Sequence, residues 1–359
     1  MMRRRFEKPG RWAAAALLAL SGSLSPAQAD SDQLPGPVGL GGIVDPAARW
    51  ELVSSAECFT EGIANAPDGL IYYSDIMSTA DCAEGGPQEG AILAFDPASM
   101  ATQVFRSPSG QSNGLVFTAT GDLLVAQGAD FGGRRVSRID MQTGRSHILA
   151  HSYAGRRLNS PNDLVVGPDG LIYFSDPRYA GYEAVEQPIQ GVYRIEQDRS
   201  VTAFVTDASK PNGLAFSPDG KTLYVAAADD NGSMDYTRHL DKQATHTGFM
   251  ALLAYPILGD GSAGKRSILV SYEGVNTAGP DGLNVDSEGN IYVALFGIDN
   301  PGIFVYAPDG SELGHFPTGG VWPTNTELVR DPGGTRYLYM TGGNALYRIE
   351  VLAEAGSGG

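Results

Sequence analysis

Apolar positions along the chain recur in a pattern of two short strands joined by a turn. In each copy a polar residue precedes an apolar run of about four to six residues, then a turn containing Pro, Asp or Gly, then a second apolar run. β-Branched and aromatic residues dominate both runs, as β-strands favour, and the turn residues are those that tight hairpins need. Six copies begin at Glu61, Asn113, Asn162, Asn212, Asp281 and Asn325.

The spacing of the copies predicts the fold class. Their first residues lie between 44 and 69 residues apart, and repeats near fifty residues that hold several short strands are typical of propeller blades. The third copy continues into two more apolar runs, at 191–195 and 201–205. We therefore predict an all-β protein, a six-bladed β-propeller of four-stranded blades, spanning residues 45–352.

The two ends of the chain have a different composition from the repeats. Residues 1–29 combine a basic start, an apolar run over 12–20 and a small-residue site at 27–29, which predicts a secretory signal peptide and a periplasmic or secreted protein. No later segment is long and apolar enough to predict a membrane span. We expect a polar N-terminal segment at 30–44 and a flexible tail at 353–359.

The charge balance narrows the class of partner. The net charge is −16, and without residues 1–29 the chain has 20 basic and 40 acidic side chains. Such acidity argues against a nucleic-acid partner. It is compatible with solubility alone and with a site for a hard divalent cation. A closed ring of blades leaves few free strand edges, so we expect a monomer.

Two features lie between or beside the repeats. Cys58 and Cys82 flank the first strand pair, and in an oxidising compartment they form either a disulfide or two small buried residues without a link. The long interval between the fourth and fifth copies contains a polar insertion at 229–248. This insertion could shape the substrate entrance, bind a second metal, or be a solvated loop.

The leading residues of the copies suggest a metal site. The innermost strand of each blade lines the central channel, so residues at one phase of the repeat converge near the axis. Any single Asn or Asp before Gly could be a turn former, but Glu is a poor turn residue and four copies share this phase. Two carboxylates and two amides give an all-oxygen set, which suits Ca²⁺, with Mg²⁺, Mn²⁺ and Zn²⁺ as alternatives. The proposed ligands are Glu61, Asn162, Asn212 and Asp281.

Three segments carry a resemblance to a known family. Residues 158–166, 172–177 and 211–220 resemble the gluconolactonase branch of the SMP-30/gluconolactonase/LRE family, and the similarity extends over nearly the whole chain after residue 29. The resemblance implies a six-bladed propeller with a divalent cation, commonly Ca²⁺, bound by a Glu, two Asn and an Asp. It places these ligands on the same four residues that the repeat phase indicates.

The resemblance also implies an activity, the hydrolysis of a small-molecule lactone, most readily a sugar lactone. Asp281 is the candidate to accept a proton from the attacking water, or else to attack directly. Asn113, Asn162 and Asn325 are candidate substrate-binding residues. Arg178 stands where the family often has a second proline, and we expect it either to contact an anionic substrate or to point to solvent.

Two alternatives remain open at this stage. The same site could serve an organophosphate or aryl-ester hydrolase. A non-catalytic binding or scaffold propeller could also retain the cation as a structural element. The segment 127–136 departs from the pattern common in gluconolactonases, which leaves the identity of the substrate open.

Overall fold

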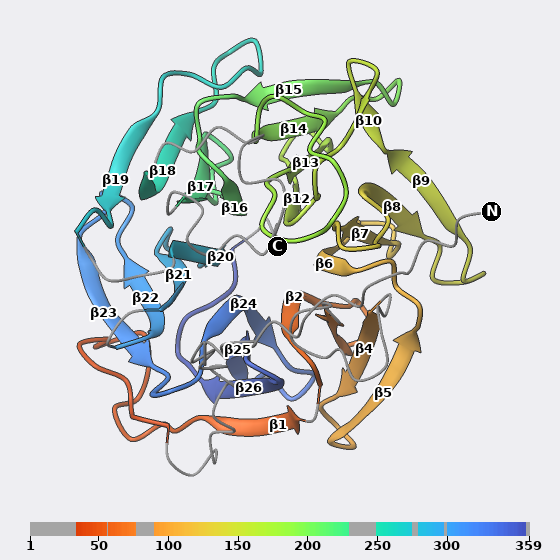
Figure 1. Ribbon diagram of the computed structural model, residues 1–359. Helices are drawn as coiled ribbons and strands as arrows, with labels where there is room; N and C mark the ends of the chain where they lie inside the picture. Colours follow the sequence, from red (N-terminus) through yellow and green to blue (C-terminus); the bar gives the residue numbers. More distant parts are fainter. Residues whose placement is uncertain are drawn as a thin grey trace, which may run out of the picture.

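Six β-sheets form a closed ring in this protein (Figure 1). The computed structural model describes residues 34–55, 57–76, 90–229, 249–274, 279–297 and 300–356. Within these ranges the named elements are 26 β-strands and no helix. Six sheets have four strands each, and a two-stranded ribbon lies between the second and third. The predicted six-bladed β-propeller is confirmed.

Each of the first three blades runs from the axis outward in sequence order. The first contains β2 (Thr60–Asn65), β3 (Ile71–Asp75), β4 (Ala91–Asp96) and β5 (Ala101–Arg106). The second contains β6 (Ser112–Phe117), β7 (Leu123–Gln127), β8 (Arg135–Ile139) and β9 (Ser146–Ala150). The ribbon β10 (Ser152–Tyr153) and β11 (Arg156–Arg157) follows. The third contains β12 (Leu164–Val166), β13 (Ile172–Ser175), β14 (Val192–Ile195) and β15 (Val201–Val205).

The next two blades repeat this order, and the sixth is closed by the N-terminal strand. The fourth contains β16 (Pro211–Phe216), β17 (Thr222–Ala228), β18 (Met250–Pro256) and β19 (Ser267–Ser271). The fifth contains β20 (Gly279–Val285), β21 (Ile291–Phe296), β22 (Gly302–Tyr306) and β23 (Glu312–Pro317). The sixth contains β24 (Pro323–Arg330), β25 (Arg336–Gly342), β26 (Ala345–Glu350) and β1 (Glu51–Ser55).

The pairing of β1 with β26 closes the ring. Glu51 lies opposite Arg348 in this antiparallel pair, and the Arg348 Nε donates to the Glu51 carboxylate at 2.7 Å. The outermost strand of the sixth blade therefore comes from the opposite end of the described chain. Closure removes the free edge that an open sheet would present there.

Large side chains fill the spaces between neighbouring blades. Tyr173 of the third blade packs edge-on against Phe204 and against Phe216 of the fourth blade, with ring centroids 4.8 and 5.1 Å apart. Strands with a neighbouring blade on each face are buried along their whole length, and their apolar residues run together instead of alternating. Every residue of β3 and of β7 is accordingly buried.

The expected polar segment at 30–44 is described from residue 34 and the expected tail at 353–359 only to residue 356, and the described parts pack against the blades. Leu34, Leu40, Ile43 and Val44 are buried in the apolar cluster of the fifth and sixth blades. At the other end, the Gly356 N–H donates to the Val285 carbonyl at 3.0 Å. Residues 1–33 and 357–359 lie outside the described ranges. No helix in the described part of the chain is long and apolar enough to cross a membrane.

Bulges mark the start of the innermost strands. Five of the six strands nearest the axis have an irregular register at the leading polar residue, and the sixth, β12, begins two residues after it. A bulge re-aims a side chain that would otherwise follow the regular alternation of the strand. The leading residues are therefore turned out of the regular pattern at the same level of each blade.

Glycine follows the leading residue in four copies because adjacent innermost strands touch at this level. A Cβ on Gly62 would overlap the carbonyl of Asn113. A Cβ on Gly213 would lie 2.6 Å from the Asp281 carbonyl oxygen and 2.8 Å from the Leu283 nitrogen. The contacts are with backbone, which cannot rotate away as a side chain can. The repeated glycine thus permits the blades to close around a narrow axis.

Gly213→Ala should therefore destabilise the protein by about 1–3 kcal/mol, the usual range for overpacking. The backbone of residue 213 does not have a positive φ, so the effect would come from contact and not from a strained conformation. Gly259→Ala is the matched control, because its Cβ would meet no atom within 4 Å. Urea unfolding of both variants tests this, and equal stabilities would contradict the close approach.

Candidate metal centre and active site

The six leading residues of the repeats lie at the same end of the propeller, at the start of the innermost strands. All six are at least nine-tenths buried, although all are polar. Their exposed fractions are 6% for Glu61, 7% for Asn113, 8% for Asn162, 6% for Asn212, 4% for Asp281 and 7% for Asn325. A ring of buried polar side chains at this level is a candidate functional site.

The loops that enter this ring are held by carboxylates at the ends of the second strands. The Asp75 carboxylate accepts the N–H groups of residues 58 and 59 at 2.8 and 3.1 Å. In the third blade the Asp176 carboxylate accepts the N–H groups of residues 159 and 160, both at 2.8 Å. Each aspartate follows a serine at the end of the second apolar run of its copy of the repeat. It therefore positions the loop that leads to the polar residue of its own blade.

Two buried carboxylates of the ring, those of Glu61 and Asp281, have raised pKa values. Burial raises the pKa of Glu61 to about 8, and the charge of Asp163 adds to the rise while a hydrogen bond from Asn113 opposes it. Burial also raises the pKa of Asp281 well above its ordinary value, and the charges of Glu61 and Asp163 raise it further; a hydrogen bond from Asn212 opposes this shift. Without a compensating positive charge the pair disfavours double ionisation.

Asp281 has an acceptor without a partner. Its Oδ1 atom is buried and makes no hydrogen bond within the described part of the protein. A buried carboxylate oxygen in this state carries a desolvation penalty that a hydrogen bond or a cation would offset. Glu61, Asn162 and Asn212 lead the innermost strands of their blades as Asp281 does, and all four side chains carry oxygen donors of the kind that hard divalent cations bind. These residues therefore suit a divalent cation.

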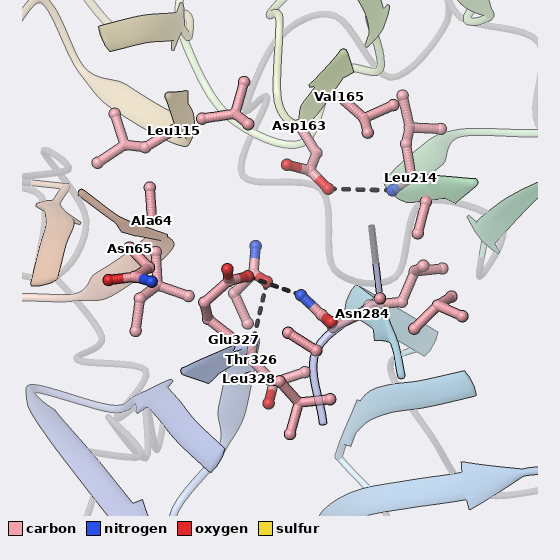
Figure 2. Close-up of a pocket in the computed structure, with 18 of the residues that line it drawn as sticks. Ala64, Asn65, Leu115, Asp163, Val165, Leu214, Asn284, Thr326, Glu327 and Leu328 are labelled. Atoms are coloured by element: carbon pink, nitrogen blue, oxygen red, sulfur yellow. Dashed lines mark hydrogen bonds between the residues drawn. The ribbon is translucent and has the colours of Figure 1, made fainter. Parts of the chain in front are cut away.

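Further along the innermost strands lies a cavity of about 160 Å³, shown in Figure 2. Asp163 lies in its wall and accepts the N–H groups of Leu164 and Leu214 at 2.9 and 3.0 Å. Asn284 and Glu327 also line it, and Asn284 donates to the Glu327 carboxylate at 2.6 Å. Burial raises the pKa of Asp163 to about 7 and that of Glu327 to about 8. A second polar layer thus lies under the first.

Sequence reasoning missed this second layer. Asp163 occupies the position that holds glycine in four other copies. This departure from the repeat was the signal that could have drawn attention to Asp163. Its side chain takes the place of a close backbone contact, since it bonds to the N–H of Leu214 in the next blade. Glu327 and Asn284 lie two and three residues after their leading residues, at positions that the repeat does not distinguish by type.

Arg178 has a different environment from the one expected. Its side chain is 1% exposed, whereas an arginine that contacts a substrate or points to solvent needs an accessible guanidinium group. The guanidinium donates to the Asn159 carbonyl at 2.8 and 3.2 Å and to the Glu183 carbonyl at 2.7 Å. The structure therefore gives Arg178 a role in holding the loop between β13 and β14.

The remaining expected residues are only partly described. Cys58 is disulfide-bonded, and Cys82 lies outside the described residues. Within the insertion at 229–248, only Asp229 is described, and it is fully buried and accepts a hydrogen bond from Ser209. Residues 230–248 lie outside the described ranges.

The fold and the buried oxygen-donor ring define the protein as a six-bladed propeller with a candidate cation site on its axis. Residues 59–344 match the SMP-30/Gluconolactonase/LRE-like region. The chain belongs to this family, which confirms the resemblance identified from its repeats.

Similar proteins are named as lactone hydrolases. A gluconolactonase of Zymomonas mobilis subsp. mobilis is 30% identical over 286 residues, which cover 77% of this chain and 74% of that protein. The lactonase drp35 of Staphylococcus epidermidis is 25% identical over 327 residues, which cover 86% and 88%. The solved structure of a gluconolactonase from Xanthomonas campestris has a TM-score of 0.69 and 28% identity, and the match covers 91% of this chain and 96% of that one. The expected enzyme class, a hydrolase of carboxylic ester bonds, is the class of these relatives.

The raised pKa of Glu61 predicts how metal-free protein responds to pH. The folded pKa is about 8 against an ordinary value of 4.5, so between these values the folded chain binds more protons than the unfolded chain. The free energy of unfolding should therefore fall as pH rises from about 4.5 to about 8, by up to about 1.4 kcal/mol per pH unit for one group.

Urea unfolding of chelator-treated protein across this range measures the slope. Glu61→Gln should flatten it, whereas Glu350→Gln, an exposed substitution at the end of β26, should leave it unchanged. A slope that is the same in Glu61→Gln and in the unaltered chain would show that the buried carboxylate does not titrate in this way.

Proposed function

We propose that this protein hydrolyses a lactone, most readily a sugar lactone, with the aid of a divalent cation, Ca²⁺ in the first instance. The observation that carries the proposal is the buried ring of oxygen donors, in which Asp281 Oδ1 has no hydrogen-bond partner among the described residues. Membership of the family and the names of the similar proteins support the lactone as substrate. Glu61, Asn162, Asn212 and Asp281 would hold the cation.

A bound divalent cation would supply Lewis-acid polarisation of the lactone carbonyl and would lower the pKa of a water molecule. The protein would supply the base. Asp281 is buried beside a second carboxylate, and it would accept the proton of the attacking water at a carboxylate oxygen. The surrounding ring would exclude bulk water, because every member is at least nine-tenths buried.

The two remaining leading residues would orient the substrate. Asn325 uses its Oδ1 to accept the Thr326 N–H at 2.8 Å, which leaves its amide N–H groups directed elsewhere. Asn113 donates one hydrogen bond to Glu61, and an amide nitrogen carries two donors. Both side chains can therefore donate to oxygens of a bound lactone. Asn162, which leads the third blade at the same level, would be a third residue in contact with the substrate.

Replacement of Asp281 by Ala should abolish both activity and cation retention. We expect lactone turnover to fall roughly a thousandfold or more, since a base and a charged ligand are lost together. Asp198→Ala, in the exposed turn between β14 and β15, is the control and should behave as the unaltered protein. Turnover and Ca²⁺ content are measured on the same preparations, and full activity of Asp281→Ala would disprove the assignment.

Asn325→Ala should raise KM more than it lowers kcat, because one substrate hydrogen bond is lost while the base remains. A loss of about tenfold in kcat/KM is expected for one such bond. Asn290→Ala provides a comparison, since Asn290 is also buried but bonds to Asp286 in a turn away from the ring. Steady-state kinetics on a sugar lactone tests this, and a Ca²⁺ affinity lowered in parallel with activity would instead make Asn325 part of the cation site.

The substrate panel also separates the competing functions. Metal-stripped protein is tested with each of Ca²⁺, Mg²⁺, Mn²⁺ and Zn²⁺ on lactones, aryl esters and phosphotriesters. Cation-dependent lactone hydrolysis supports the proposal. Preference for an aryl ester or a phosphotriester would keep the site but change the reaction, and cation binding without any hydrolysis would indicate a binding or scaffold propeller.

We also propose that the protein acts outside the cytoplasm. The basic and apolar character of residues 1–29 is the first support. The disulfide at Cys58 is the second, because structural disulfides persist mainly in oxidising compartments. Fractionation of the producing cells would locate the mature protein.

A further inference from the structure

Two exposed aromatic rings lie together on the site side of the second and third blades. Phe131 is 51% exposed and Tyr182 is 47% exposed, and their ring centroids are 5.9 Å apart. They belong to the connections β7–β8 and β13–β14. The innermost strand starts at the site end and the second strand returns to it, so both connections emerge at the same end as the buried ring. In Figure 1 the green connection β13–β14 reaches the middle of the ring.

A carboxylate fastens the two connections to each other. Glu183 accepts the N–H of Asp130 at 3.1 Å with Oε2 and the N–H of Phe131 at 2.9 Å with Oε1. Gly181 allows the approach, because its Cβ would lie 2.6 Å from the Asp130 nitrogen. Arg178, which is fully buried, holds the Glu183 carbonyl at 2.7 Å. The contact between the loops is therefore built from buried and charged groups and does not depend on the aromatic rings alone.

The backbone beneath Phe131 is held in an unfavourable conformation. Asp130 and Phe131 have φ angles of 60° and 67°, in the left-handed region that costs a non-glycine residue about 1–2 kcal/mol. Two such residues in succession persist only where the surroundings impose them. As a result the large apolar ring of Phe131 lies on the surface, where no burial offsets the cost of the strained backbone. Strain combined with exposure indicates a functional constraint at this position.

The same loops are tied to the layer of proposed ligands. The Ala129 N–H donates to the Ser160 Oγ at 2.9 Å, and Ser160 lies two residues before Asn162. The Gln111 side chain donates to the Asp130 carbonyl at 3.3 Å, and Gln111 lies two residues before Asn113. The connection that carries Phe131 is thus attached to the segments that lead to Asn113 and Asn162.

We infer that Phe131 and Tyr182 form an outer subsite that binds a flat, apolar substituent carried by the lactone. This inference deepens the proposed function, since it assumes that the buried ring binds the lactone. Two adjacent exposed rings offer stacking and edge contacts to an aromatic or alicyclic group, and their attachment to residues 111 and 160 gives continuity with the site. A substrate with such a group would bind through both the ring of oxygen donors and the aromatic pair.

The test uses non-hydrolysable lactams, so that it does not depend on turnover. Calorimetry compares δ-valerolactam with a benzyl-substituted δ-valerolactam in Ca²⁺-loaded protein. Phe131→Ala and Tyr182→Ala should each weaken binding of the benzyl compound about five- to tenfold and change binding of δ-valerolactam less than twofold. Ile148→Ala, equally exposed at 51% on the outer strand β9, should change neither.

The outcomes separate this inference from the proposed function. Failure of the lactone panel together with tighter, aromatic-dependent binding of the benzyl lactam would remove the reaction but keep the subsite. Equal affinity of the unaltered protein for the two lactams would overturn the subsite, as would equal effects in Phe131→Ala and Ile148→Ala. Sedimentation of a dimer that is lost in Phe131→Ala would assign the pair to self-association and also overturn it.

Discussion

The close approach of the innermost strands at one level of the axis is the constraint on which the rest of the structure depends. At this level a methyl group on Gly62 or Gly213 would collide with the backbone of the next blade. Five of the strands carry bulges there, which turn their leading polar side chains out of the regular alternation. Closure of the ring and convergence of the site are therefore consequences of the same local geometry. A wider ring would accept larger residues but would separate the donors.

The convergence of the leading residues places two carboxylates in a buried site, and the neighbouring amides only partly offset the cost of ionising both. Glu61 and Asp281 are both buried, which raises the pKa of each, and the charge of Glu61 raises the pKa of Asp281 further. The amides of Asn113 and Asn212 donate to them and reduce this penalty, but they bring no full charge. A divalent cation would balance two carboxylates and satisfy the unpartnered Oδ1 of Asp281. The features that destabilise the metal-free site are thus the features that suit it to a cation.

The sequence predicted well what depends on the repeat and poorly what depends on contacts between different parts of the chain. The six leading residues were identifiable because a repeated phase in a propeller fixes a common position near the axis. Burial of Arg178 could not be read from its neighbours, since it depends on the carbonyl of Asn159, which lies on a different loop, before β12. Packing of residues 34–44 also escaped prediction, because their apolar side chains follow no repeat and meet the fifth and sixth blades only after closure.

Asp163 is a residue of the site itself whose contacts could not be predicted from the sequence. It interrupts the repeated glycine, and its charge influences the pKa of Glu61 and of Asp281, yet the sequence gives no reason to expect its bond to Leu214 in the next blade. The aromatic pair could not be predicted either, since Phe131 and Tyr182 belong to connections whose sequences do not follow the repeat. Residues imposed by blade closure carry the proposed ligands, whereas the connections are free to vary without affecting closure. The chemistry of such a propeller can therefore persist while its choice of substrate changes, and the substrate preference of this protein should be sought in its connections.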